Sequence, residues 1–377
     1  MEWGLLALPG SLIWLGVLLL PWKPRSTEET LDAGINTTRT AIDLSRITVL
    51  IPARNEEDCI SETLDGLALQ GSGLAIIVID DQSDDRTSTI ARSKNIPGLQ
   101  VVQGHPLPAG WSGKLWALEQ GRLLASTPLL LLLDADIYLK PGTLNELVWK
   151  MEQEQLDLVS LMAQLRMDSF WEKMLMPAFV FFFKLLYPFR LSNSKQSRVA
   201  AAAGGCILVK AEMLEKISAF SSLQHCLIDD CSLAGKIKKA GGNIWLGLTH
   251  SAVSQRPYHR LEDIWSMVER NAFTQLQHSW LLLCLCTLLL IAAFVLPVAA
   301  IFTGNTVSIF TGIAAVGLLL TCYLPVLRYY SINPFWGCCL PVTGVLYLLM
   351  TWTSAWQYLT GKGARWKDRS YSALAQK

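Results

Sequence analysis

The sequence predicts an α/β domain with a mostly parallel sheet flanked by helices, attached to one N-terminal and about three C-terminal transmembrane helices. Two observations lead to this prediction. In the N-terminal half of the chain, short apolar runs alternate with polar loops and helical patterns, which is the order that βαβ units give. At both ends of the chain, longer uncharged runs can cross a hydrocarbon core of about 30 Å.

The composition agrees with a membrane protein. Of the 377 residues, 51% are hydrophobic and only 17% are charged, which is little charge for a soluble protein. The net charge of +1 argues against a general nucleic-acid binder, because such a protein needs basic excess to neutralise phosphates. The nine cysteines include no C-x-x-C pair, so we expect reduced thiols rather than a disulfide framework.

The first uncharged run covers residues 3–22, and no cleavage pattern of small residues follows it. We therefore expect residues 1–22 to be a retained anchor rather than a signal peptide. Lys23 and Arg25 follow the anchor, and residues 23–45 are expected to form a linker. We expect the chain to lie in the inner (plasma) membrane. The positive-inside rule then places the following domain, residues 46–278, in the cytoplasm.

Within that domain, four short apolar runs predict buried parallel strands. They lie at residues 47–51, 75–79, 99–102 and 129–133. Helical patterns begin near Ile60 and Thr87, after the first and second runs. Ligands of such sheets bind beyond the carboxyl ends of the strands, so the polar clusters at these ends predict a site.

Two of these clusters are acidic. Asp80 and Asp81 end the second strand, where a turn or a helix cap would also explain them. Asp134 and Asp136 follow the run of five leucines directly. Unpaired charge is costly at the end of a buried strand, and hard oxygen ligands select Mg²⁺ or Mn²⁺, which substrate phosphates usually complete. The D-x-D therefore predicts a divalent metal held with a phosphate-bearing substrate.

The C-terminal part predicts the remaining membrane region, residues 279–360, with uncharged runs at 279–302, 306–327 and 335–359. Residues 361–377 form a basic tail that includes Lys362, Arg365, Lys367 and Arg369. Three full spans would put this tail on the face opposite the domain, whereas its charge favours the cytoplasm. Either the last run is re-entrant, or the charge rule fails here.

Two further stretches predict interfacial helices. Residues 170–190 are apolar and aromatic, and we expect Lys184 and Arg190 to reach lipid headgroups at the mouth of an acceptor site. A buried core helix is the alternative. Residues 261–276 carry apolar side chains at helical spacing, which predicts a second amphipathic element.

Together these motifs resemble the family 2 glycosyltransferases, whose nucleotide-binding domain is called GT-A. The matching pieces are I-P-A-R-N-E-E at 51–57, V-I-D-D-Q-S-D-D at 78–85, L-L-D-A-D at 132–136 and I-D-D at 228–230. The stretch 106–118 and the tail at 363–371 narrow the resemblance to the hopene-associated glycosyltransferases, which are similar to transferases acting on carotenoid-type and sphingoid lipids.

The resemblance implies roles for individual residues. The nucleoside pocket would be lined by Pro52, Ala53, Arg54, Asn55 and Glu56. Asp81 would bind the base, which favours a UDP-sugar, and Lys114 would face a phosphate of the donor. Asp134 would contact nucleotide and metal, and Asp136 the metal.

Asp230 would be the general base that activates the acceptor, next to Asp229 where many relatives have Glu. Capping of a helix over residues 231–240 is the alternative explanation for this acidic pair. One displacement by the acceptor would invert the anomeric centre.

The chain departs from the Q-x-x-R-W pattern of processive relatives. Gln255 is followed by Arg256, Arg260 and Trp265 at other spacings. Arg256, Arg260 and Trp265 stay candidates for diphosphate or acceptor contacts, as does Asp229. The departure favours transfer of a single sugar to a membrane lipid over polysaccharide synthesis, and the resemblance implies a hopanoid as that lipid. A polyprenyl phosphate acceptor and a non-catalytic sugar-nucleotide-binding membrane subunit are the alternatives.

Overall fold

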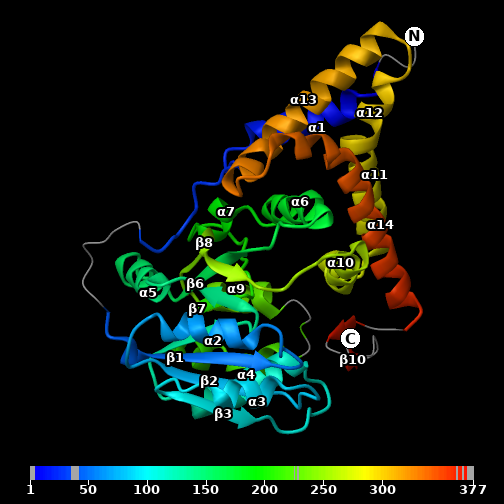
Figure 1. Ribbon diagram of the computed structural model, residues 1–377. Coiled ribbons are helices and arrows are strands. Elements are labelled where there is room, and N and C mark those ends of the chain that lie inside the picture. Colours follow the sequence, from blue (N-terminus) through cyan, green and yellow to red (C-terminus); the bar gives the residue numbers. More distant parts are fainter. Residues whose placement is uncertain are drawn as a thin grey trace. The chain divides into compact units, whose positions relative to one another are not determined.

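The computed structural model describes residues 5–34, 42–224, 226, 229–361, 364–366 and 369–371. The chain forms two compact units (Figure 1). The sheet unit comprises Glu29–Arg166, Leu191–Pro257 and Arg365–Lys377, and the helical unit comprises Met1–Glu28, Met167–Arg190 and Tyr258–Ala364. Each unit is described here by itself.

The sheet unit contains eight strands in one sheet, in the order β3-β2-β1-β4-β7-β6-β8-β5. The strands are β1 (Ile47–Ala53), β2 (Ala75–Asp80), β3 (Leu99–Gln103), β4 (Leu129–Leu133), β5 (Ile137–Leu139), β6 (Leu158–Gln164), β7 (Cys206–Lys210) and β8 (Ile244–Ser254). Its helices are η2 (Leu44–Arg46), α2 (Ile60–Ala68), α3 (Thr87–Ser93), α4 (Gly113–Leu124), α5 (Thr143–Gln153), α8 (Ala211–Lys216), η3 (Ala219–Leu223) and α9 (Asp229–Lys239).

The four predicted parallel strands are confirmed as β1 to β4. β1 pairs in parallel with β2 and β4, and β2 pairs in parallel with β3. All residues of β1 and β4 are buried, as expected for strands with helices on both faces. β1 runs two residues further than predicted, through Pro52. Proline fits there because pairing with β4 ends at Leu50, so only β2 hydrogen-bonds that part of the strand.

The structure adds β5 to β8, which the apolar runs do not predict. β7 pairs antiparallel with β4 and β6, β8 pairs in parallel with β6, and β5 pairs antiparallel with β8. These additions leave four parallel and three antiparallel pairings, so the sheet is mostly parallel as predicted. β5 and β7 bring the segments around residues 137 and 205 next to the end of β4.

Two apolar cores cover the sheet. One contains Leu131, Ile60 and Leu147, with α2 and α5; the other contains Leu132 and Leu118, with α4, α8 and α9. Successive residues of β4 thus enter opposite cores, which is the alternation that a strand imposes.

Part of the predicted linker pairs with the sheet. Thr30 forms an isolated parallel bridge with Leu248 of β8. The Asp32 carboxylate accepts hydrogen bonds from the Thr249 hydroxyl (2.9 Å) and from the backbone N–H of His250. These bonds hold the pKa of Asp32 below its usual value although burial opposes them.

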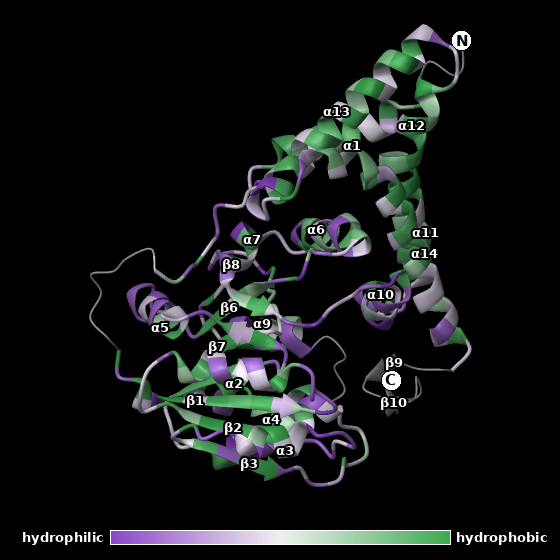
Figure 2. Cartoon of the chain, in the orientation of Figure 1, coloured by the Kyte–Doolittle hydropathy of each residue, from purple (hydrophilic) through white to green (hydrophobic). Residues whose placement is uncertain are grey.

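The helical unit consists mainly of helices, and several of them are apolar (Figure 2). Its helices are α1 (Leu8–Leu19), α6 (Phe170–Leu186), α7 (Phe189–Asn193, which continues into the sheet unit), α10 (Leu261–Gln275), α11 (Trp280–Leu290), the π-helical turn η4 (Ile291–Val295), α12 (Leu296–Ile301), α13 (Thr306–Tyr329), η5 (Pro334–Cys339) and α14 (Leu340–Leu359). A short hairpin, β9 (Ala364–Trp366) and β10 (Arg369–Tyr371), follows them.

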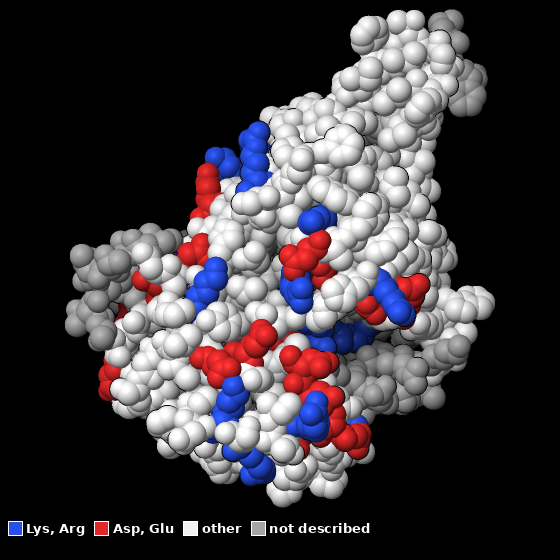
Figure 3. Space-filling view, in the orientation of Figure 1, with Lys and Arg blue, Asp and Glu red and all other residues white. Residues whose placement is uncertain are grey.

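Within the described part of the chain, three helices are long and apolar enough to cross a membrane, namely Trp280–Ile301, Thr306–Tyr329 and Pro334–Leu359. They agree with the three predicted C-terminal runs. The last of them continues past Pro341, which lies in the first turn of α14 (Leu340–Leu359), where proline is tolerated. Charged side chains are sparse on the exposed surface of these helices (Figure 3).

The N-terminal helix is shorter than the predicted span. α1 has 12 residues, so it rises by about 18 Å, well short of a hydrocarbon core of about 30 Å. Trp14 is nevertheless buried, and its Nε1 donates to the Ala293 carbonyl at 2.9 Å. α1 therefore packs against the apolar helices, while residues 1–4 lie outside the described part of the chain.

The prediction that Lys184 reaches lipid headgroups is wrong. Lys184 is buried in α6, donates to the carbonyl of Ser26 and lies over the Phe189 ring, 5.4 Å from its centroid. A buried ammonium needs an acceptor, and the Ser26 carbonyl supplies it from 158 residues away. Arg190 pairs with Glu28 at 2.6 Å. Much of α6 is thus a buried core helix, the alternative in the sequence analysis.

α10 is amphipathic as predicted. Ile264, Val268 and Phe273 are buried, and the backbone N–H of Phe273 donates to Ser354 Oγ of α14 at 3.0 Å. Its apolar face therefore packs on α14. Most of the predicted basic tail, residues 362–363, 367–368 and 372–377, lies outside the described residues.

Two glycines inside helices give a prediction about stability. A Cβ on Gly66 of α2 would lie 3.0 Å from the backbone N and O of Leu139 in β5, whereas a Cβ on Gly235 of α9 would meet nothing within 4 Å. Gly66→Ala should destabilise the protein by about 1–3 kcal/mol, because backbone cannot move aside. Gly235→Ala should stabilise it by about 0.5–1 kcal/mol. Thermal unfolding of the detergent-solubilised variants measures both, and equal effects would contradict the packing at Gly66.

Candidate functional site

The candidate site lies at the carboxyl edge of the parallel strands. β1, β2 and β4 run in the same direction, so their ends and the loops that follow meet on one side of the sheet. The predicted polar clusters follow these three strands. The segment before β7, the start of α9 and the segment after β8 complete the surroundings.

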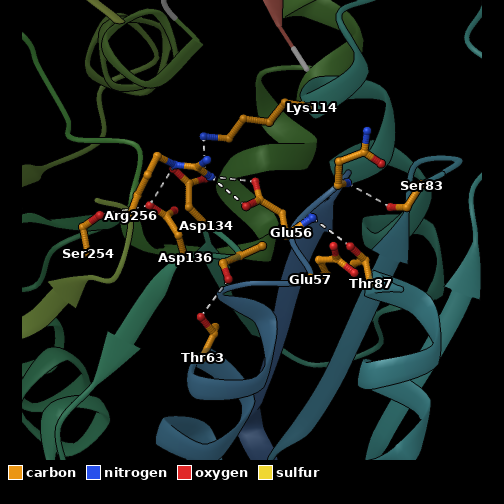
Figure 4. Close-up of polar contacts among 12 residues, drawn as sticks. Glu56, Glu57, Thr63, Ser83, Thr87, Lys114, Asp134, Asp136, Ser254 and Arg256 are labelled. Carbon is orange, nitrogen blue, oxygen red and sulfur yellow. Dashed lines mark hydrogen bonds and ion pairs between the residues drawn. The ribbon is translucent and has the colours of Figure 1, made fainter. Parts of the chain in front are cut away.

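The turn after β1 is held by side chains of the loop between β2 and α3 (Figure 4). Three successive backbone N–H groups of the turn donate to that loop. Asn55 N–H donates to Ser83 Oγ (3.1 Å), Glu56 N–H to Thr87 Oγ1 (2.7 Å) and Glu57 N–H to Asp85 Oδ2 (3.1 Å). Asn55 has a φ of +51°, a conformation that asparagine tolerates better than most residues.

The acidic pair after β2 is inside the protein. Asp80 and Asp81 are 2% and 0% exposed. Asp80 Oδ1 accepts from the Ser83 N–H at 3.0 Å, as in an Asx turn. The Arg54 guanidinium donates to the backbone carbonyl of Asp81 at 2.6 Å and to that of Gln82 at 2.8 Å. Arg54 thus holds the backbone of this loop in place. The Asp81 side chain is buried and not exposed to a ligand.

The D-x-D lies in the tight turn between β4 and β5. The Ile137 N–H donates to the Asp134 carbonyl at 3.1 Å, and the Thr63 hydroxyl to the carbonyl of Ala135 at 2.8 Å. The Asp136 carbonyl accepts from the N–H of Gln255 at 2.7 Å. The turn is therefore fixed from α2 and from the end of β8.

Each carboxylate of the D-x-D has a cation beside it (Figure 4). Lys114 Nζ lies 2.7 Å from Asp134 Oδ1. Arg256 Nε lies 3.4 Å from Asp136 Oδ2, which also accepts from Ser254 Oγ at 2.9 Å. The same guanidinium forms two bonds to Glu56, of 2.7 and 2.8 Å.

Lys114 lies in the first turn of α4, which the Ser112 side chain caps. Its ammonium group lies between two acidic pairs. Its Nζ is 2.7 Å from Asp134 and 4.0 Å from Asp229 Oδ2. Burial alone would lower the pKa of Lys114, but the charges of Asp134 and Asp229 hold it above its usual value. Burial raises the pKa of Asp134, against the opposing effect of Lys114. Lys114 is therefore charged at neutral pH and joins both groups.

Asp229 and Asp230 form the first turn of α9 rather than preceding it. Asp230 Oδ2 accepts from the Gly204 N–H at 2.9 Å, and its Oδ1 from the Cys231 N–H at 2.7 Å. Burial and the charge of Asp229 raise the pKa of Asp230 to about 6, although Lys114 and the two N–H groups act in the other direction. These two bonds occupy one lone pair on each oxygen and leave others for a ligand.

Gly204 explains the small residues that precede β7. A Cβ at this position would lie 3.2 Å from Lys114 Nζ and 3.3 Å from Asp230 Oδ2. Glycine thus lets the backbone approach both side chains without pressing on them.

Lys114, Asp134 and the acidic pair of α9 line one small pocket. Pro52 and Gly204 also line it. Its apolar walls are Leu115, Leu118, Leu132, Leu133, Ile207, Phe220, Leu223 and Leu233. A cavity with apolar walls and a few converging polar groups is the usual form of a small-molecule site.

The donor set fits a divalent ion that a substrate completes. Among the described residues, no group of three or more His, Cys, Asp and Glu side chains is placed to hold a metal. The protein alone would supply the carboxylates of Asp134 and Asp136, and Mg²⁺-type sites often use one or two carboxylates with substrate phosphates. The residues present therefore fit such an ion.

The structure thus brings together most of the predicted site residues. Pro52, Lys114, Asp134, Asp229 and Asp230 line one cavity. The predicted residues Asp136, Glu56 and Arg256 form one ionic network. Ala53 is buried in β1. Arg260 and Trp265 belong to α10 and its N-cap in the helical unit, so their contacts to diphosphate or acceptor stay predictions.

Ser254 and the Glu56–Arg256 pair are contributions that sequence reasoning misses. Ser254 comes at the end of β8, a strand that the apolar runs do not predict. Glu56 and Arg256 are 200 residues apart, and no local pattern links them. Both were candidates for substrate contacts, but nothing in the sequence indicates that they bind each other.

Comparison with known proteins shows what this site is similar to. Residues 48–218 match the family model described as Glycosyl transferase family 2, so this part of the chain is similar to family 2 glycosyltransferase domains. The match runs from β1 past β7 and includes the D-x-D, and it ends before Asp229 and Asp230.

Curated relatives match over a shorter stretch. The 4,4'-diaponeurosporenoate glycosyltransferase of Staphylococcus haemolyticus (strain JCSC1435) is 37% identical over 93 residues, which are 25% of this chain and 24% of that protein. The protein of the same name from Staphylococcus aureus (strain USA300) is 34% identical over 103 residues, 27% of each chain. The chain thus spans about a quarter of the length of the curated relatives it matches.

A solved structure shares the fold. Mannosyltransferase PcManGT from Pyrobaculum calidifontis, in complex with GDP-Man and Mn²⁺, aligns with a TM-score of 0.59 at 18% identity, over 94% of this chain and 99% of that chain. At this identity the likeness concerns the fold alone, which is the GT-A-like α/β fold that the sequence resemblance implies.

The position of Lys114 between acidic pairs predicts a pH-dependent loss of stability. Lys114→Gln leaves Asp134, Asp229 and Asp230 without their shared cation, so it should destabilise the protein by about 1–2 kcal/mol at pH 8. Lys114 lowers the pKa of Asp134 and Asp230, so its removal raises both values. Protonation then relieves the repulsion, and the loss should shrink towards pH 5.5.

The measurement is thermal unfolding of the variant and the wild type at both pH values. Lys94→Gln is the control, because Lys94 pairs with the exposed Asp65 away from the site at 2.6 Å. Its effect should be below about 0.5 kcal/mol and similar at both pH values. A pH-independent loss in Lys114→Gln would contradict the charge network.

Proposed function

We propose that this chain is a membrane-bound, inverting glycosyltransferase that moves a single sugar from a nucleotide diphosphate sugar to a lipid acceptor. The observation that carries the proposal is the position of Lys114. It pairs with Asp134 of the D-x-D and lies 4.0 Å from the acidic pair of α9, all in one cavity. Groups for the leaving diphosphate and for the acceptor hydroxyl thus lie side by side.

The donor half of the site neutralises the leaving group. A departing nucleoside diphosphate gains negative charge, and cations placed beforehand stabilise that charge most effectively. Lys114 and Arg256 are both half-buried cations next to the D-x-D. Asp134 and Asp136 would hold Mg²⁺ or Mn²⁺, which supplies Lewis-acid stabilisation of the diphosphate when bound.

The acceptor half removes a proton. Asp230 is the proposed general base, and burial next to Asp229 raises its pKa to about 6. A base works best when its pKa lies near the working pH, because it is then ionised and still basic. A single displacement by the activated hydroxyl inverts the anomeric centre. The apolar walls of the cavity exclude water that would hydrolyse the donor.

The acceptor is proposed to be an apolar lipid with one reactive hydroxyl or carboxyl group. Two observations support it: helices long enough to span a membrane follow the family 2 match in the sequence, and curated relatives are named as glycosyltransferases of a carotenoid acid. A hopanoid is the specific acceptor suggested by the resemblance at residues 106–118 and 363–371. The family 2 domain is proposed to face the cytoplasm, where nucleotide sugars are made.

The assignment of the nucleotide base rests on the family resemblance. A uridine nucleotide is proposed because Asp81 follows β2 in the motif V-I-D-D, but Asp81 is fully buried. A nucleotide base could contact the Asp81 carboxylate only after the loop between β2 and α3 opens. Thermal stabilisation by UDP and not by GDP supports uridine, and the reverse result replaces it with guanosine.

The test of the function is transfer itself. The purified protein in lipid vesicles is incubated with radiolabelled UDP- and GDP-sugars and a bacterial lipid extract, and the products are identified by mass spectrometry. We expect one labelled lipid carrying a single sugar, and none with Asp136→Asn or in the presence of a chelator. A labelled polymer or a glycosyl polyprenyl phosphate would show that the acceptor belongs to another class. Nucleotide binding without any transfer would indicate a non-catalytic subunit.

The role of Asp230 predicts a selective loss of turnover. Asp230→Asn keeps the size of the side chain and an acceptor oxygen for one of the two N–H groups, of Gly204 or of Cys231, that Asp230 binds. Turnover should fall by about 10²–10⁴-fold, because the charge is needed only as the hydroxyl loses its proton. Donor affinity should change by less than about threefold. Near-normal turnover in this variant would move the base elsewhere, with Asp229 the first place to look.

The pH profile provides a second prediction. A base is active only when ionised, so kcat/KM should rise with pH to a plateau, with its midpoint near the pKa of about 6 for Asp230. Asp229 raises that pKa, so Asp229→Asn should move the midpoint to lower pH. A midpoint that stays in place would show that Asp230 does not set it.

A further inference from the structure

We propose that Glu56 is a positioning residue that holds Arg256 against Asp136, where Arg256 fills the cation position of the D-x-D until nucleotide and metal bind. The inference rests on the proposed function, because it assigns Asp136 to a divalent ion. It changes the expected role of Glu56, which sequence resemblance places in the nucleoside pocket. It also makes binding of the metal dependent on the nucleotide.

The geometry shows which partner holds the guanidinium. Arg256 Nη2 forms bonds of 2.7 and 2.8 Å to both carboxylate oxygens of Glu56, whereas its Nε lies 3.4 Å from Asp136 Oδ2 (Figure 4). Charge-assisted bonds of that shorter length are strong. Glu56 is therefore the firm anchor, and Asp136 is the partner that can be given up.

Burial makes the pairing necessary. The side chains of Glu56 and Asp136 are 9% and 13% exposed, and a carboxylate this far from water needs a cation or several donors. Asp136 has one further donor, Ser254 Oγ. Without a divalent ion, Arg256 satisfies both carboxylates at once.

The backbone on both sides keeps this arrangement in place. Glu56 N–H donates to Thr87 Oγ1 at 2.7 Å, which fixes where the side chain starts. Arg256 follows Gln255, whose N–H donates to the Asp136 carbonyl at 2.7 Å. Both ends of the Glu56–Arg256 bridge are thus tied to rigid parts of the sheet unit, as a positioning pair requires.

Exchange of partners couples the two ligands. A divalent ion at Asp136 meets the positive charge of Arg256, and like charges at such a short distance repel each other. A diphosphate offers Arg256 a new anionic partner. The metal therefore binds weakly alone and more tightly with nucleotide, and this coupling is reciprocal.

The first experiment measures Mn²⁺ binding without nucleotide, by electron paramagnetic resonance of free Mn²⁺ over the full-length protein in detergent. Arg256→Gln removes the competing charge, so Mn²⁺ should bind about tenfold more tightly than to the wild type. Arg256→Lys keeps the charge and should stay within about threefold of the wild type. Arg86→Gln is the matched control, because Arg86 pairs with the neighbouring Glu57 at 3.0 Å on the surface.

Unchanged or weaker Mn²⁺ binding in Arg256→Gln would overturn the inference while leaving the proposed function intact. If no variant binds Mn²⁺ even with UDP or GDP present, metal-dependent transfer fails and the inference fails with it. The two failures are therefore distinguishable in one data set.

The second experiment tests Glu56 by a double-mutant cycle on nucleoside diphosphate affinity at saturating Mn²⁺. If Glu56 acts only through Arg256, Glu56→Gln should weaken binding about threefold to tenfold in the wild type and by less than twofold in Arg256→Gln. Equal losses in both backgrounds would return Glu56 to the nucleoside pocket. Glu57→Gln, one residue on, should have no effect in either background.

Discussion

The site depends on one constraint: a carboxylate at the end of a buried strand needs a cation. β4 is apolar throughout and ends at Asp134, where desolvation would otherwise disfavour the charge. Lys114 comes to it from α4, and Arg256 comes to Asp136 from the segment after β8. The two cations thus join elements that are far apart in the sequence to one turn. The same ion pairs that stabilise the edge of the sheet also define the site.

Such a site is prepared for anions before any substrate arrives. The cations are already held beside the place of a diphosphate, so binding exchanges ionic partners instead of ordering free side chains. Preorganised charges of this kind cost no reorganisation when charge develops in a reaction. The exchange also explains how the protein tolerates the cluster: Lys114 and Arg256 offset the carboxylates when the site holds no substrate.

The sequence predicts those parts of the structure that depend on local patterns. Strands buried on both faces read as apolar runs, so β1 to β4 and the D-x-D could be located. β5 to β8 could not, because short mixed runs fit a strand or a helix equally well. Long-range contacts were also out of reach. The Glu56–Arg256 pair spans 200 residues and Lys184 meets a carbonyl 158 residues away, and neither choice of partner leaves a local signal.

The position of Asp230 shows how the fold fixes the orientation of a single side chain. α9 is attached to the preceding segment at both of its ends. At its start, Asp230 accepts the Gly204 N–H. Near its end, Lys238 donates to the carbonyls of Ser192 at 2.7 Å and Val199 at 2.6 Å, and burial lowers the pKa of this lysine. A helix tied twice to one loop cannot rotate about its axis, so the carboxylate stays aimed at the cavity. Rigid support of this kind keeps a reactive group within the small tolerance that proton transfer allows.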